Sequence, residues 1–147
     1  MEASQASDVG SIPIARSILS RAIDSSMGIE ATLINALMNT SSELTRIARE
    51  VAGRIVEIIH PEKVILFGSA ARGEANENSD IDLFIVAKTD KPFPSRMSPI
   101  HDILHDMHYP CNVESIIYTP DEFRNAQEKG SLFVHEILTT GMVLYDS

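Results

Sequence analysis

The sequence contains little cysteine and no long apolar run. Its single cysteine, Cys111, has no partner in the chain, so an internal disulfide is excluded and a structural thiol in a reducing compartment is expected. No stretch approaches the ~20 apolar residues of a membrane-spanning helix. The first residues also lack the basic and apolar segments of a secretion signal. These absences predict a cytoplasmic protein that does not enter a membrane.

Basic residues are also scarce. The chain has 12 Lys and Arg against 21 Asp and Glu, which gives a formal net charge of -9. Nonspecific affinity for nucleic acid comes mainly from basic side chains that neutralise phosphates, so stable nucleic-acid binding is not expected and a cationic or neutral partner is favoured. With 147 residues, 44% of them hydrophobic, the chain is long enough to form one domain with its own core.

The most informative stretch consists of two apolar runs, VILFGSAARG from position 64 and SDIDLFIV from position 79. In the second run, Asp80 and Asp82 are two residues apart, so on a strand they share one face while Ile81 lies on the other. Two carboxylates on a rigid face suit a hard cation such as Mg²⁺, which is usually held by few carboxylates together with substrate phosphates.

The end of the first run predicts the other half of such a site. Gly68 allows the backbone to approach a ligand closely, and the free N–H groups of a helix that begins at Ser69 would face an anion. A phosphate-binding turn beside a carboxylate pair predicts metal-assisted phosphoryl chemistry.

The motifs GSAARG and SDIDLFIV together resemble the nucleotide-binding core of the DNA-polymerase-beta-like nucleotidyltransferase superfamily. More narrowly, they resemble the minimal nucleotidyltransferases, in which GSxARG and SDxDL recur. The resemblance implies an α/β fold with a short mixed sheet flanked by helices, here with an extra helical N-terminal segment. It extends from about Thr40 to the end, so we divide the chain into residues 1–39, a tail with short helices, and residues 40–147, the nucleotidyltransferase domain.

The resemblance implies the roles of three carboxylates. Asp80 and Asp82 would be catalytic metal ligands for Mg²⁺. Glu114 occupies the position where the superfamily often places a third carboxylate, typically Asp, and would act as third metal ligand or general base. The side chain of Glu is one methylene longer, which leaves open a weakly active or divergent site.

The resemblance also implies how ATP would be held. Gly68 and Ser69 would bind its β- and γ-phosphates through backbone N–H groups and the hydroxyl. Arg72 would neutralise triphosphate charge, because a guanidinium recognises phosphate bidentately. Alternatively, Arg72 forms a surface ion pair with Glu74 or Glu77.

Minimal nucleotidyltransferases resemble the antitoxin half of toxin–antitoxin pairs whose partner is a HEPN-type ribonuclease toxin. This resemblance implies transfer of AMP from ATP to a tyrosine of such a partner. Two alternatives stay open: a nucleotidyltransferase-fold module that neutralises a partner by contact alone, and an enzyme that modifies a small molecule such as an aminoglycoside. The N-terminal helices could also form a dimer or partner surface.

Apolar spacing and capping residues predict the elements along the chain. Thr40, with Glu43 three residues later, predicts a capped helix start, and Pro61 follows the end of that helix. The predicted helices cover 12–24, 29–38, 40–59, 98–107, 120–129 and 132–140, and the predicted strands begin near 63, 80, 112 and 142.

Overall fold

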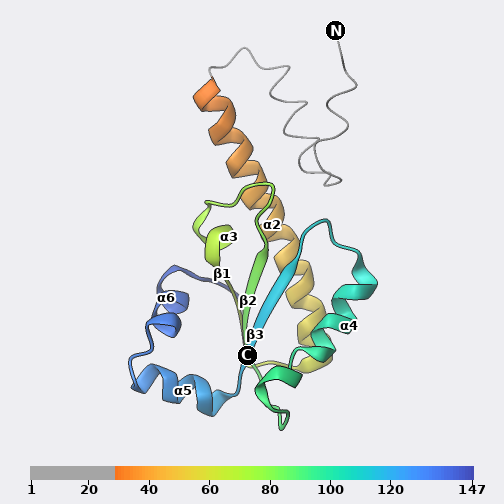
Figure 1. Cartoon of the computed structure of the whole chain (residues 1–147), viewed down its shortest axis with the longest axis vertical. Coiled ribbons are helices and arrows are strands. Elements are labelled where there is room, and N and C mark those ends of the chain that lie inside the picture. The colour runs from red at the N-terminus through yellow and green to blue at the C-terminus, as the bar shows by residue number, and fades with distance from the viewer. Residues whose placement is uncertain (1–28) are drawn as a thin grey trace.

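The computed structural model describes residues 29–147, which form a four-stranded sheet packed between helices (Figure 1). The strand order is β3-β2-β1-β4; β1 pairs antiparallel with β2 and β4, and β2 pairs parallel with β3. The predicted mixed sheet flanked by helices is therefore confirmed. The elements are α2 (Ile29–Ile59), β1 (Lys63–Phe67), α3 (Gly68–Arg72), β2 (Ile81–Val86), η2 (Phe93–Ser95), α4 (Ser98–Met107), β3 (Val113–Tyr118), α5 (Pro120–Glu128), α6 (Leu132–Thr140) and β4 (Met142–Asp146).

Different helices cover the two faces of the sheet. Successive side chains of β2 point to opposite faces, so their neighbours show which helices cover each face. Ile81, Leu83 and Ile85 are buried in the cluster that contains the apolar face of α2 and Ile100 of α4. Phe84 is buried on the other face, in a second cluster built from α5 and α6. Because side chains alternate along a strand, Asp82 shares the face of Phe84.

The predicted helix start at Thr40 is wrong, because α2 runs without a break from Ile29 to Ile59. The side chain of Thr40 is buried, and its hydroxyl donates to the carbonyl oxygen of Ala36, 3.0 Å away. Threonine can satisfy its hydroxyl in this way inside a helix, so the capping pattern did not mark an end. The first part of α2 extends beyond the sheet (Figure 1), and there Leu33 is 58% exposed.

The predictions that involve residues 1–28 lie outside the described part of the chain. The division of the chain at residue 40 stays a prediction. Within residues 29–147, no helix combines the length and the apolar character needed to cross a membrane.

The later helix boundaries agree with the predictions. The Thr119 side chain accepts a hydrogen bond from the backbone N–H of Glu122, whose carboxylate accepts one from the Thr119 N–H, which completes a capping box. Helix α6 ends before Gly141, where the backbone dihedral φ is an ordinary -75°. A Cβ at Gly141 would come closer than 3.0 Å to Ile137 O and to Ile65 Cγ2, so glycine is required there by space.

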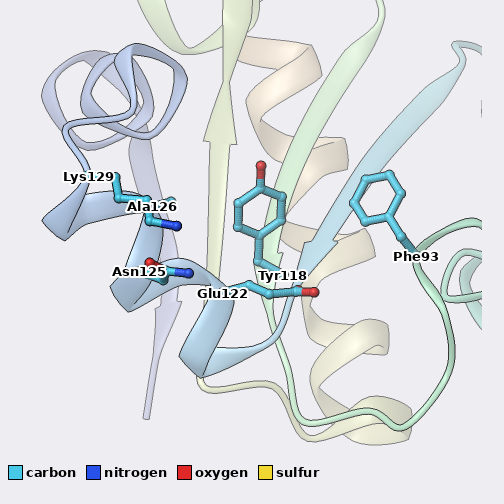
Figure 2. Close-up of a pocket in the computed structure, with 6 residues that line it drawn as sticks. All are labelled: Phe93, Tyr118, Glu122, Asn125, Ala126 and Lys129. Atoms are coloured by element: carbon cyan, nitrogen blue, oxygen red, sulfur yellow. The ribbon is translucent and has the colours of Figure 1, made fainter.

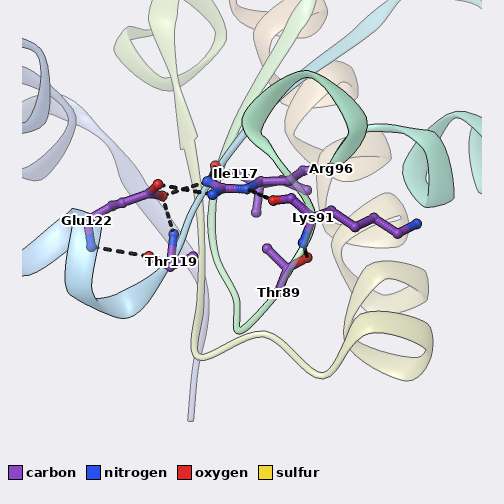
Figure 3. A network of polar contacts seen from close by, with 6 residues as sticks. All are labelled: Thr89, Lys91, Arg96, Ile117, Thr119 and Glu122. Atoms are coloured by element: carbon purple, nitrogen blue, oxygen red, sulfur yellow. Dashed lines mark hydrogen bonds and ion pairs between the residues drawn. The ribbon is translucent and has the colours of Figure 1, made fainter.

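A buried arginine that the sequence analysis did not single out fixes the connection between β2 and α4 (Figure 3). Arg96 donates to the carbonyl oxygens of Lys91 at 2.9 Å and Ile117 at 3.2 Å. It also donates to both Glu122 carboxylate oxygens, at 2.6 and 3.0 Å. The hydrogen bonds from Arg96, and then that from the Thr119 backbone, lower the pKa of Glu122 to about 2.

Candidate active site

Asp82 lies at the centre of a row of side chains that crosses three strands. It pairs with Phe67 of β1 on one side and with Glu114 of β3 on the other. Directly paired residues of neighbouring strands have their side chains on the same face, so Asp82 and Glu114 lie side by side. Asp82 is half-buried and Glu114 is exposed, and Asp80 comes immediately before β2. The sheet therefore brings the three predicted carboxylates to the same end of β2 and β3.

The electrostatics of this group are unfavourable for the isolated protein. Burial raises the pKa of Asp82, and the neighbouring charges of Glu114 and Asp80 raise it further, while Arg72 lowers it. A bound cation would relieve this repulsion. The donors are all carboxylate oxygens, which fits a hard ion such as Mg²⁺.

The carboxylates do not enclose a metal by themselves. Among the side chains that the structure describes, no group of three His, Cys, Asp or Glu residues is close enough together to hold an ion. Mg²⁺ usually takes one or two protein carboxylates and completes its shell with waters and substrate phosphates, so the pair Asp80 and Asp82 matches its needs. This arrangement could hold a metal whose shell is completed by waters and by a phosphate-bearing ligand.

Gly68 places the backbone directly beside the Asp82 carboxylate. It is the first residue of α3, immediately after β1, and its backbone dihedral φ is +72°, a region that favours glycine. A Cβ at this position would come closer than 3.0 Å to Asp82 Oδ2 and within 3.2 Å of Asp82 Cγ. Glycine is therefore needed here for conformation and for space, and the predicted residues Gly68 and Asp82 form one site.

Arg72 ends α3 close to the same carboxylates. Its Nε donates to Glu74 Oε2 at 2.8 Å, so the ion pair predicted as one alternative is present. A second carboxylate oxygen, Glu136 Oε1 of α6, lies 3.7 Å from its Nη1. No sequence signal could have identified Glu136, because folding alone brings α6 beside α3. Exposed ion pairs contribute little free energy, so the Arg72 guanidinium can exchange them for a phosphate.

Comparison with known proteins agrees with this geometry. The family model described as "Polymerase beta, Nucleotidyltransferase" matches residues 50–147. The chain is 34% identical over 89 residues to the "Putative protein adenylyltransferase" of Methanocaldococcus jannaschii, a match that covers 56% of this chain and 57% of that protein. The chain thus spans little more than half the length of this curated relative.

Two solved structures share the fold. A crystal structure of a "putative nucleotidyltransferase" from Sulfolobus solfataricus aligns with a TM-score of 0.54 at 18% identity, over 75% of this chain and 86% of that one. A chain from a toxin-antitoxin crystal structure with AMP-PNP aligns with a TM-score of 0.50 at 19% identity, over 67% of this chain and 73% of that one. The family match, which covers most of the chain, confirms the resemblance: this protein belongs to the polymerase beta nucleotidyltransferase family.

Proposed function

We propose that this protein transfers AMP from ATP to a hydroxyl group of another protein, with a tyrosine of a HEPN-type toxin as acceptor and an antitoxin role as the result. The observation that carries the proposal is the close approach of Gly68 to Asp82, beside the pair Asp82 and Glu114. The named activity of the M. jannaschii relative and the nucleotide in the toxin-antitoxin structure support it. The net charge of -9 suits a partner with a basic active surface.

The proposal includes a resident metal ion. Asp80 and Asp82 would hold Mg²⁺, with Glu114 as third ligand or as general base. When bound, Mg²⁺ would supply positive charge that stabilises the phosphate oxygens of the transition state. Burial and the neighbouring charges of Glu114 and Asp80 raise the pKa of Asp82, and the two neighbouring charges support this assignment because they place three carboxylates near one point.

The residues of the chain then have separate roles in the proposed reaction. The backbone N–H groups of Gly68 and Ser69 and the Ser69 hydroxyl bind the β- and γ-phosphates. Arg72 leaves its ion pair with Glu74 and binds the triphosphate. Glu114, which is exposed, accepts the proton of the acceptor hydroxyl. The acceptor oxygen bonds to the α-phosphorus, the bond from that phosphorus to the bridging oxygen breaks, and pyrophosphate leaves.

Incubation with Mg²⁺ and α-labelled ATP tests the proposal. The purified protein is mixed with the product of the neighbouring gene, and both are analysed by intact mass. We expect the neighbour to gain the mass of one AMP with the wild type. The double variant Asp80→Asn with Asp82→Asn should give no adduct, and Glu128→Gln, an exposed acid on α5, is the matched control that should retain activity.

The exposure of Glu114, which contrasts with the half-buried Asp82, favours one second candidate, a module that neutralises its partner by contact alone. The same experiment separates the two. A stable complex that forms equally with the double variant, and that never carries AMP, would contradict the catalytic proposal and support the contact module.

A further inference from the structure

The sheet face that carries the carboxylates also carries a hollow of about 350 Å³, shown in Figure 2. We call it the aromatic hollow, and its lining residues are Phe93, Tyr118, Glu122, Asn125, Ala126 and Lys129. Its volume lies at the lower end of the range for small-ligand sites, about 300–1,000 Å³, which is also enough for one large side chain. No step of the proposed reaction uses it.

The aromatic walls of the hollow pack against neighbouring rings and a guanidinium group. Tyr118 packs edge-on against the buried ring of Phe84, with 5.1 Å between ring centroids. Phe93 is 54% exposed, and its ring lies 6.4 Å from Tyr118 and 5.8 Å from the Arg96 guanidinium carbon. Arg96 is itself held by Glu122. A preformed site loses little conformational entropy on binding, so these rings are suited to hold a guest.

The polar groups of the hollow select the charge of that guest. Both oxygens of its only lining carboxylate, Glu122, accept hydrogen bonds from Arg96, and one of them also accepts from the Thr119 N–H. That charge is therefore already neutralised. Asn125 of α5 and Lys129, which follows the end of α5, contribute an amide and an ammonium group. The hollow thus suits a large apolar side chain with an anionic group beside it.

The position of the hollow relates it to the carboxylates. Tyr118 and Glu114 lie on the same strand and the same face, four residues apart, which corresponds to about 13 Å. An extended polypeptide covers this distance in about four residues. A segment that runs parallel to β3 with its hydroxyl at Glu114 would therefore place its fourth following residue at Tyr118.

We propose that the aromatic hollow anchors the acceptor polypeptide. It takes an aromatic side chain that is followed by an acidic residue and stands four positions from the hydroxyl that receives AMP. This inference rests on the proposed function for the identity of the acceptor, and it adds the element by which the site selects its substrate.

Fluorescence anisotropy with the labelled peptide Tyr-Ala-Ala-Ala-Phe-Asp, without nucleotide, tests the anchor. Phe93→Ala and Lys129→Glu should each weaken binding about tenfold. Lys88→Glu, an exposed lysine outside the hollow, is the matched control and should bind as the wild type does. Substitution of Tyr118 is avoided because its ring packs in the core cluster.

Two results would overturn the anchor. In the first, the wild-type protein binds the Phe-Asp peptide no more tightly than it binds a peptide with alanines in place of Phe-Asp. In the second, both hollow variants bind the Phe-Asp peptide as tightly as the wild type does. Peptides with zero, three or six intervening alanines then separate the anchor from the reaction. With ATP and Mg²⁺, transfer that is equally fast at all spacings would refute the anchor while the function stands. If the hollow variants weaken peptide binding but AMP is transferred to neither peptide nor protein, the proposed function would be refuted while the anchor stands.

Discussion

The substitution Gly68→Ala tests the arrangement of the site most directly. Alanine at this position must adopt a φ of +72°, which costs about 1–2 kcal/mol for a residue with a Cβ. Its Cβ would also come closer than 3.0 Å to Asp82 Oδ2. That oxygen is the end of a rotatable side chain, so it can move out to an ordinary separation of 3.4 Å or more. We therefore expect the collision to displace the carboxylate rather than to unfold the protein.

A second glycine, which lies directly after the other end of α3, provides the control. Gly73 has a φ of +74°, and a Cβ there would meet nothing within 4 Å. Gly73→Ala therefore carries the same backbone strain without the collision. Both variants should lose about 1–2 kcal/mol of unfolding free energy, measured by urea titration.

AMP transfer should separate the two variants. A shift approaching 1 Å in a reacting group can reduce a rate about 100-fold, so Gly68→Ala should lose about 10- to 100-fold in initial rate. Gly73→Ala should stay within about twofold of the wild type, because its change touches no reacting group. A Gly68→Ala protein that is fully active, or a Gly73→Ala protein that is equally impaired, would refute the assignment of Asp82 and Gly68 to one site.

Three further predictions concern stability. Asp82→Asn should stabilise the fold by about 0.5–1 kcal/mol at pH 7, a small value because the side chain is partly exposed. The raised pKa of Asp82 means that folding disfavours the charged carboxylate. The gain in melting temperature should therefore disappear as the pH falls to the ordinary pKa of 3.8. Glu122→Gln leaves Arg96 without its counter-ion and should cost about 1–2 kcal/mol after allowance for solvent screening. Since the pKa of Glu122 is lowered from 4.5 to about 2, that cost should be full above pH 4.5 and vanish as the pH approaches 2; a constant difference in melting temperature across this range would contradict the pairing. Gly141→Ala should cost about 1–3 kcal/mol in urea unfolding through overpacking against Ile65, and an unchanged midpoint would show that the chain relaxes freely there.

Much of the candidate site could be predicted because its signals are local. The alternation in SDIDLFIV places Asp82 on the face opposite Ile81, and the buried side chain of Ile81 confirms that assignment. The capped starts of α5 and α6 agree with the structure for the same reason, since a cap depends on residues three positions apart. The predicted bounds of α4, which rest on the spacing of its apolar residues, also agree. The roles of these residues in metal and nucleotide binding stay predictions.

The failed prediction at Thr40 also has a local cause. A threonine three residues before a glutamate satisfies the capping pattern, but the same hydroxyl can bond the carbonyl four residues back inside a helix. Glu43, the expected capping partner, instead accepts hydrogen bonds from Arg46. The capping pattern therefore fits both a helix start and a helix interior, and by itself it does not decide whether α2 continues.

The sequence by itself determined the family, the strand that bears Asp82, and the glycine Gly68 that lies beside this carboxylate. Each of these is encoded in residues that lie close together in the chain. Only the tertiary structure decided which distant groups meet. Strand pairing set Glu114 beside Asp82, folding brought Glu136 to Arg72, and burial paired Arg96 with Glu122. These contacts depend on the order and direction of strands and on which helix covers which face, and such choices follow from the burial of the whole apolar surface rather than from any short motif.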